Sequence, residues 1–389
     1  KKPALRFKGF TDPWEQRKLE EYLEVSGQKN FEGIYTKEDV LSVSGDFGIV
    51  NQIEFQGRSF AGASVANYGV VETGDIVYTK SPLKSNPYGI IKANKGKNGI
   101  VSTLYAVYKP KQSANPEFVQ NYFEQDARMN NYMHPLVNKG AKNDMKVSAE
   151  NALKGQIVFP DIKEQRTISE FFRNLDTLIT LHQRKYEKLV NIKKSMLDKM
   201  FPKNGASVPE IRFKGFTDLW EQRKLGEVFE EYSEKNHAEL PPLTIIQGGG
   251  TIRRDESERA LQYDKSSLSN YKMVNKDDFI VHLRSFEGGL EKASSQGIIS
   301  PAYHTFHGED VDSRFYYAYF RSKNFINKDL KPHVYGIRDG RSIDIEGMKT
   351  IRIPWASYPE QKSIGDFLTH LDTLITLHQR KLKKLVQIR

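Results

Sequence analysis

The sequence of 389 residues contains no cysteine. Disulfide bonds and thiolate metal sites are therefore excluded, and this composition fits a reducing compartment such as the cytoplasm. Long apolar runs are missing as well, since no stretch approaches the roughly 20 residues that a membrane-spanning helix requires. The opening KKPALRFKGF lacks the apolar core that a secretion signal carries. We therefore expect a soluble, cytoplasmic protein that is not inserted in a membrane.

Acidic residues are outnumbered by basic ones. The chain has 59 lysines and arginines against 49 aspartates and glutamates, which gives a formal net charge of +10. This balance favours an anionic partner, with nucleic acid and an acidic membrane surface as the leading choices. Hydrophobic residues make up 38% and charged residues 28%, an ordinary globular composition in a chain long enough for two or more domains.

Two stretches of the sequence occur twice. RFKGFTDPWEQRKL begins at Arg6 and returns at Arg212, 206 residues later, with Pro13 replaced by Leu219. LDTLITLHQRK begins at Leu175 and returns unchanged at Leu371, 196 residues later. Two long copies, unlike the many short ones of a solenoid, predict a pseudo-two-fold internal repeat.

The pieces between these constant stretches, roughly residues 20–159 and 226–353, predict mixed strands and loops. Short β-branched and aromatic runs such as GDIVYT at Gly74 and DFIVHL at Asp278 hold matching positions in the two halves. The loops differ, because QIEFQGRSFAGASVANYG has no relative in TIRRDESERALQYDKSSLSN. PEFVQNYFEQDARMNNYM, from Pro116, predicts a helix. A shared scaffold with divergent loops indicates one fold that recognises two different things.

Residues 160–201 and 354–389 predict two long helices. Each opens with the pattern of a capping box, Asp161 with Glu164 and Ser357 with Glu360. Apolar residues then recur at steps of three and four, the period of a coiled coil. A histidine on such a seam is expected to set register. The predicted interface positions are Ile168, Phe172, Leu175, Ile179, His182 and Leu189, with Ile364, Leu368, Leu371, Ile375, His378 and Leu385.

We therefore predict an α+β fold in which two similar domains are separated by two long antiparallel helices that form a coiled coil. The domains would span residues 1–159 and 202–353, and the spacer helices residues 160–201 and 354–389. The second helical pattern stops at Arg389 in mid-repeat, which predicts that it is truncated there.

This organisation resembles the specificity subunit, HsdS type, of bacterial type I restriction–modification enzymes. The resemblance covers essentially the whole chain: two variable domains, two RFKGFTD segments and two helix entries of the form P…EQ…I…LD.LI. Those entries are Pro160, Glu164, Gln165, Ile168, Leu175, Asp176, Leu178 and Ile179 in the first helix, and Pro354, Glu360, Gln361, Ile364, Leu371, Asp372, Leu374 and Ile375 in the second.

The resemblance implies a function and a set of partners. Each variable region would be a target recognition domain that reads one half of a split, asymmetric duplex DNA sequence. The helices would space the domains and bind two copies of the modification methyltransferase, which carries S-adenosylmethionine and methylates adenine. Restriction motor-nuclease subunits would complete the complex, and this subunit itself would bind no cofactor or metal and perform no chemistry.

Basic and amide side chains in the variable loops are the candidate DNA contacts. Lysine and arginine neutralise phosphates, arginine grips guanine, and small polar side chains read base edges. The candidates are Lys80, Lys84, Asn86, Lys139 and Lys142 in the first domain, and Arg253, Arg254, Arg284, Ser285, Arg338 and Arg341 in the second.

Two other functions stay open at this point. An enzyme acting on DNA, a nuclease or a methyltransferase, would need its own site. SNPYG at Ser85–Gly89 lacks the second proline of an NPPY-type box, and QGGGT at Gln247–Thr251 lacks the lysine of a phosphate-binding loop, so ordinary turns are favoured for both. A structural adaptor, whose helices bind protein and whose basic charge is incidental, is the second alternative.

Overall fold

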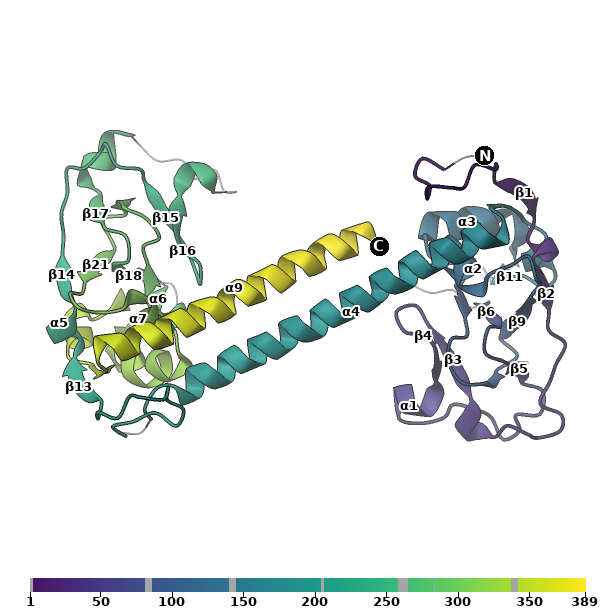
Figure 1. Cartoon of the computed structure of the whole chain (residues 1–389), viewed down its shortest axis with the longest axis horizontal. Coiled ribbons are helices and arrows are strands. Elements are labelled where there is room, and N and C mark those ends of the chain that lie inside the picture. The colour runs from purple at the N-terminus through teal and green to yellow at the C-terminus, as the bar shows by residue number, and fades with distance from the viewer. Residues whose placement is uncertain are drawn as a thin grey trace. The chain divides into compact units, whose positions relative to one another are not determined.

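The computed structural model describes residues 3–80, 86–139, 145–203, 206–257, 265–282, 284–336 and 342–389. The chain forms two compact units (Figure 1). Unit 1 comprises Lys1–Leu178 with Arg389, and unit 2 comprises Ile179–Ile388. Helix α4 (Ile162–Lys199) thus contributes its first part to unit 1 and its second part to unit 2. The boundaries drawn from the sequence for two domains and two spacer helices remain a prediction.

Unit 1 is a mixed domain of short antiparallel strands and helices. Its elements before α4 are β1 (Glu15–Lys18), β2 (Leu23–Val25), β3 (Leu41–Ser44), β4 (Gly48–Asn51), α1 (Gln52–Gln56), β5 (Gly69–Val71), β6 (Ile76–Thr79), β7 (Ile91–Ala93), β8 (Gly99–Val101), β9 (Tyr105–Pro110), α2 (Pro116–Phe123), α3 (Asp126–Met133), β10 (Asn138–Lys139), β11 (Met145–Lys146) and β12 (Gln156–Phe159).

Unit 2 repeats this plan after α4. Its elements are β13 (Glu221–Lys224), α5 (Leu225–Val228), β14 (Glu230–Tyr232), β15 (Leu243–Ile246), β16 (Gly250–Arg253), β17 (Lys272–Val274), β18 (Phe279–Val281), α6 (Ser285–Gly288), β19 (Glu291–Lys292), β20 (Gly297–Ile299), β21 (His304–His307), α7 (Ser313–Phe320), β22 (Val334–Tyr335), β23 (Ser342–Ile343), α8 (Ile345–Lys349), β24 (Arg352–Trp355) and α9 (Tyr358–Ile388).

The two units share one sheet topology. A four-stranded antiparallel sheet has the order β2-β9-β6-β7 in unit 1 and β14-β21-β18-β19 in unit 2. The smaller pairs match as well: β3–β4 with β15–β16, β5–β8 with β17–β20, and β10–β11 with β22–β23. The predicted α+β class and internal repeat are therefore confirmed. Both units have the same strand order, and the loops that connect the strands differ in sequence.

The central strands are buried on both faces, which explains their continuous apolar sequences. In β6, Ile76 and Tyr78 face a core that also contains Phe118 of α2 and Phe159 of β12. Val77, pointing the other way, packs in a second cluster with Leu41, Val101 and Val107. In unit 2, β18 does the same, with Phe279 in the larger cluster and Ile280 in the smaller one.

The repeated opening segment of each half packs on the start of a long helix. Its EQRK strand pairs with the strand directly before that helix, β1 with β12 and β13 with β24. Phe7 meets Phe171 edge to face at 5.6 Å between ring centroids, and Phe213 meets Phe367 at 5.8 Å. The aromatic residues of the constant segment therefore serve packing.

The helices start differently from the capping boxes expected from the sequence. Asp161 does cap α4, since its Oδ1 accepts from the backbone N–H groups of Lys163 and Glu164 at 2.7 and 3.1 Å. Glu164, however, does not close the box, because its carboxylate binds the guanidinium of Arg6 at 2.7 and 2.6 Å. Glu360 of α9 likewise binds Arg212.

One predicted helix is divided. The sequence from Pro116 forms α2 and α3 instead of a single helix, because Gln125 has extended backbone angles, φ −77° and ψ 114°, and begins a new helix. Asp126 follows in the first turn of α3, where a negative charge is favourable. In unit 2, α7 is followed by a π-helical segment, Phe325–Leu330.

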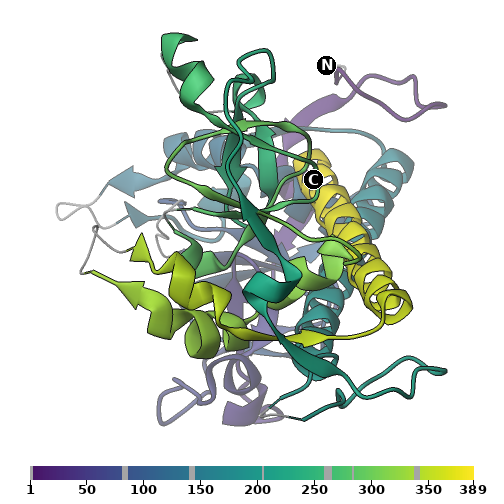
Figure 2. The same cartoon turned by 90° about the vertical axis from the view of Figure 1, so that its left-hand side faces the viewer.

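Within unit 2, residues 179–199 of α4 run antiparallel beside α9, teal and yellow in Figure 2. His182 Nδ1 lies 2.8 Å from His378 Nδ1, and Lys193 pairs with Asp372 at 2.5 Å. The histidines of the repeated LDTLITLHQRK thus face each other on the seam, as predicted. Among the described residues, no helix is both long and apolar enough to cross a membrane.

Candidate nucleic-acid interface

The first group of candidate DNA contacts lies at the connection between β6 and β7. Lys80 directly follows β6 and is half-buried. Asn86 precedes β7, and its carbonyl accepts from the backbone N–H of Gly89 at 3.0 Å in a tight turn. Lys139 is the last residue of β10. Lys84 and Lys142 lie outside the described residues.

The matching connection in unit 2 joins β18 to β19. Arg284 is exposed there and precedes α6. Ser285 was predicted to contact DNA, and the structure argues against that role, because its side chain is fully buried. Its hydroxyl accepts from the backbone N–H of His282 at 2.9 Å, so it holds the loop. Arg338 and Arg341, between β22 and β23, lie outside the described residues.

The other arginine candidates follow the β15–β16 hairpin. Arg253 ends β16 and is exposed, with a surface ion pair to Asp255 at 2.8 Å. Arg254 is half-buried, and its guanidinium lies 5.2 Å from the ring centroid of Tyr271 and donates to the Tyr271 hydroxyl at 3.3 Å. Arg253 is therefore the more accessible of the two, whereas Arg254 packs on its own domain.

The matched hairpin of unit 1, β3–β4, carries an aromatic cluster that the sequence analysis did not single out. Phe47, in the hairpin turn, is 67% exposed, and Phe55 of α1 is 45% exposed. Their ring centroids are 5.3 Å apart. Phe60 is exposed as well and lies under the guanidinium of Arg58 at 4.6 Å. The density of phenylalanines in a segment without a relative in the other half could have drawn attention to them.

These rings stand on a hydrogen-bonded frame. Asn51 caps α1 by accepting from the N–H groups of Ile53 and Glu54 at 3.0 and 3.1 Å. Gln52 Oε1 accepts from the N–H of Phe60 at 2.6 Å, which holds the segment after the helix. Because the frame fixes the backbone, the exposed rings are presented at low cost in conformational entropy.

The glycine-rich QGGGT of the sequence binds an internal anion. The backbone N–H groups of Gly248 and Gly250 donate to the carboxylate of Glu291 at 2.7 and 3.1 Å. The Tyr317 hydroxyl donates to the same carboxylate at 2.7 Å, and Arg321 pairs with it. Glu291 is fully buried, so this loop supports the fold of unit 2.

Part of the predicted helix interface packs on the domains themselves. Ile364, Leu368 and Leu371 were assigned to contacts of the helices with each other and with a methyltransferase, and they are buried in the core of unit 2, against which Leu189 and Ile192 of α4 also pack. Ile168 packs against the core of unit 1 in the same way. Leu175 is buried too. The remaining seam positions are half-buried: Phe172, Ile179, His182, Leu189, Ile375, His378 and Leu385.

A different set of apolar side chains on the helices is exposed. These are Phe171, Leu178, Leu181 and Val190 on α4 and Leu377, Val386 and Ile388 on α9. The sequence analysis did not choose them as interface residues. Exposed apolar rows on a long helix are typical of surfaces that bind another protein.

Comparisons with known proteins agree with this architecture. Residues 217–387 match the family described as the type I restriction modification DNA specificity domain. The chain is 23% identical over 257 residues to a protein described as the specificity subunit of the MjaX type I restriction enzyme of Methanocaldococcus jannaschii. That match covers 62% of this chain and 58% of the relative, so it spans little more than half the relative's length.

Two solved structures resemble the whole chain. The S subunit of a type I restriction–modification system from M. genitalium has a TM-score of 0.53 at 11% identity, over 98% of this chain and 96% of that one. The HsdS subunit from Thermoanaerobacter tengcongensis has a TM-score of 0.47 at 14% identity, over 97% and 94%. At 11% identity, the similarity to the M. genitalium subunit shows a shared fold.

Proposed function

We propose that this chain is an HsdS-type specificity subunit and that it recognises a split, asymmetric duplex DNA sequence, one half with each unit. The observation that carries the proposal is the contrast at one matched hairpin. The β3–β4 hairpin of unit 1 presents Phe47 in its turn, packed on Phe55, whereas the turn of the β15–β16 hairpin has Gly249 at the matched position and the exposed residue is Arg253, at the end of β16. One scaffold whose matched hairpins expose different side chains suits two different half-sites.

The two hairpins would read DNA in different ways. Arg253 suits a guanine edge or a phosphate. Phe47 and Phe55 are flanked in sequence by Asp46 and Glu54, so this region suits contacts to bases, by stacking or against a thymine methyl group, better than contacts to phosphate. Phosphate contacts would come from the lysines and arginines of the β6–β7 and β18–β19 connections.

The subunit would direct chemistry performed by its partners. The exposed apolar rows of α4 and α9 support docking of two copies of a modification methyltransferase, which would carry S-adenosylmethionine, and restriction subunits would join the same complex. The chain itself would act as a non-catalytic recognition subunit. The seam of α4 and α9 would hold the gap between half-sites constant, near one helical turn of DNA, roughly 10–10.5 base pairs between half-site centres.

Mapping of adenine methylation in the host, with and without this gene, tests the proposal. We expect one split sequence, with two different halves and a fixed gap, to lose methylation when the gene is removed. An unchanged methylation map would refute it. The purified complex with its methyltransferase should bind that duplex, and the logarithm of its affinity should fall linearly with the logarithm of salt concentration.

Two controls separate the alternatives. A duplex with one half-site scrambled should bind at least about tenfold more weakly, since each mismatch costs about 1–3 kcal/mol. Equal affinity for every duplex would favour the structural adaptor. Incubation of the chain alone with S-adenosylmethionine, magnesium and duplex should give no methylation and no cleavage, and turnover there would favour an enzyme.

A further inference from the structure

Two buried glutamines occupy the same place in the two units, directly after the glutamates that bind the repeated arginines. Gln165 and Gln361 expose none of their side-chain surface. A buried amide destabilises the fold unless its donors and acceptor are satisfied. The amide nitrogens donate to the carbonyls of Pro160 and Ala356, at 2.9 and 2.8 Å, in the segment that leads into each long helix.

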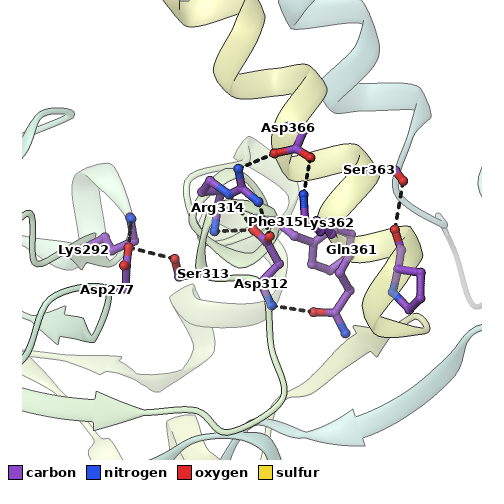
Figure 3. Close-up of polar contacts among 11 residues, drawn as sticks. Asp277, Lys292, Asp312, Ser313, Arg314, Phe315, Gln361, Lys362, Ser363 and Asp366 are labelled. Carbon is purple, nitrogen blue, oxygen red and sulfur yellow. Dashed lines mark hydrogen bonds and ion pairs between the residues drawn. The ribbon is translucent and has the colours of Figure 1, made fainter.

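Each glutamine also holds the N-cap residue of a domain helix. Gln165 Oε1 accepts from the backbone N–H of Asn115, ahead of α2, at 2.9 Å. Gln361 Oε1 accepts from the backbone N–H of Asp312, ahead of α7, at 3.0 Å, as Figure 3 shows. Asn115 and Asp312 themselves cap these helices through their side chains. The long helix is thus fastened to the domain at the N-terminus of α2 or α7.

This contact is independent of the domain's side chains. Every residue except proline has a backbone N–H, so the glutamine accepts equally from asparagine in unit 1 and from aspartate in unit 2. A helix entry that bonds to backbone can therefore orient domains of different sequence in the same way.

The side chains beside the glutamine are, by contrast, particular to each unit. In unit 1 the hydroxyl of Ser169 donates to Asn115 Oδ1 at 2.8 Å. One turn further along α4, Arg173 pairs with Glu117 of α2 at 2.8 Å. The cation therefore lies on the long helix and the anion on the domain.

Unit 2 has the opposite arrangement at the matched positions. Ser169 is replaced by Gly365, where an added Cβ would lie 2.6 Å from Asp312 Oδ1, so a larger residue would force the aspartate side chain to shift. Arg173 is replaced by Thr369. Arg314 of α7 pairs with Asp312 and reaches across to Asp366 of α9 (Figure 3). Here the cation lies on the domain and the anion on the long helix, where α4 also has an acidic residue, Glu170, at the matched position.

Each domain would fit the other helix poorly. On α9, Glu117 would face Asp366, and the arginine that neutralises it on α4 would be missing. On α4, Glu170 would still offer Arg314 an acidic partner, but Arg173 would lie beside it, and the aspartate cap of the second domain would meet the side chain of Ser169. Like charges at contact distance destabilise an interface, and buried overlap forces the partners apart.

We propose that each long helix carries a docking site that is selective for its own domain. The glutamine sets the orientation of the domain, and the segments 169–173, SEFFR, and 365–369, GDFLT, decide which domain is accepted. Gln165 and Gln361 are positioning residues in this scheme. The inference rests on the proposed function only where it concerns the spacing of half-sites.

Exchange of the two segments in the full chain tests the selectivity without DNA. Placing GDFLT at 169–173 and SEFFR at 365–369 should lower the midpoint of thermal unfolding by about 5 °C, since it breaks both docking sites. A second variant, in which residues 20–155 and 226–351 are also exchanged, should recover most of the loss. An unchanged midpoint in the first variant, or no recovery in the second, would overturn the selectivity.

Substitution of one glutamine tests the positioning role. Gln361→Met keeps the side-chain volume and removes the bonds to the backbone. The complex carrying it should bind the same two half-sites but accept gaps one base pair shorter or longer within about threefold of the original affinity, whereas Gln379→Met, at an exposed position of α9, should discriminate like the parent.

The outcomes are distinguishable from a failure of the proposed function. If Gln361→Met lowers only the unfolding midpoint and gap discrimination is kept at a temperature where it is folded, the positioning role is wrong. If the parent complex binds all gaps alike, the proposed function fails, and the segment exchange alone then decides whether the docking sites exist.

Discussion

Lys92 of β7 and Glu124, directly after α2, form a salt bridge in unit 1 with Nζ and Oε1 3.2 Å apart. The matched positions in unit 2 hold Glu291 and Arg321, which pair with reversed polarity. The match follows from the strand registers, since Lys92 lies opposite Val77 and Glu291 opposite Ile280. The fold therefore accommodates an ion pair between sheet and helix at this point in either direction.

Reversing the pair in unit 1 should be tolerated better than breaking it. Lys92→Glu alone places two carboxylates together at a site where the residue is 7% exposed, and should cost about 3 kcal/mol of unfolding free energy. Lys92→Glu with Glu124→Arg should recover at least about half of that. Chemical denaturation of the three proteins measures both values.

Recovery should stay partial, because Glu124 also accepts from Arg389. The exposed pair of Lys18 and Glu20 supplies the control, since Lys18→Glu should change stability by less than about 0.5 kcal/mol. If the double variant is no more stable than the single one, the reading of the two units as charge-reversed equivalents is incorrect.

Removing the arginine of the constant segment should destabilise unit 2. Glu360 is 1% exposed and is held by Arg212 at 2.6 and 2.8 Å and by Trp220 Nε1 at 2.9 Å. Arg212→Met leaves this carboxylate buried without its cation, which costs about 3–5 kcal/mol. Urea unfolding followed by tryptophan fluorescence measures the change.

A loss below about 1 kcal/mol would mean that water or another cation replaces the arginine. Lys362→Ala serves as the matched control, because Lys362 pairs with Asp366 on the exposed face of α9 and should contribute little.

The paired histidines should make the helix seam sensitive to acid. The pKa of His378 is lowered by burial and by the nearby charges of His182, Lys185 and Lys381. A histidine with a lowered pKa binds fewer protons in the folded than in the unfolded state, so stability is present above the ordinary pKa of about 6.5 and is lost as the pH falls through the lowered value.

The thermal unfolding midpoint is measured at about pH 7.5 and at about pH 5.5. These values lie on either side of the ordinary pKa of histidine, about 6.5. The variant His182→Asn with His378→Asn keeps a polar pair on the seam and removes the titration. Its midpoint should fall less on acidification than that of the parent, and an equal fall would assign the sensitivity to other groups.

The exposed phenylalanines should matter for DNA and little for stability. Phe47→Ala and Phe55→Ala remove rings that are 67% and 45% exposed, so the unfolding midpoint should change by less than about 2 °C. Loss of a base–aromatic contact costs about 1–3 kcal/mol, or roughly 5- to 150-fold in affinity. Titration of the mapped duplex measures it.

Only the half-site read by unit 1 should lose discrimination in these variants. Leu104→Ala, at a position 66% exposed in the same unit, is the control and should bind DNA like the parent. If Phe47→Ala and Phe55→Ala bind DNA like the parent, other loops of unit 1 recognise that half-site.

Local pattern in the sequence was enough for the repeat, the two long helices and the strand runs. Their signals are periodicity and composition within a short window, and the LDTLITLHQRK copies even placed His182 and His378 on one seam. Two of the candidate DNA contacts are also accessible, since Arg253 at the end of β16 and Arg284 before α6 are exposed.

Only the tertiary structure decided which partners these residues have. Glu164 has the spacing of a capping box, yet it binds Arg6, which is 158 residues away. Ser285 has the composition of a reading loop, yet it is buried. The aromatic cluster of Phe47 and Phe55 became visible only once a hairpin and a helix were folded against each other. Contacts between distant segments depend on how whole domains pack, and residue spacing along the chain carries no record of that packing.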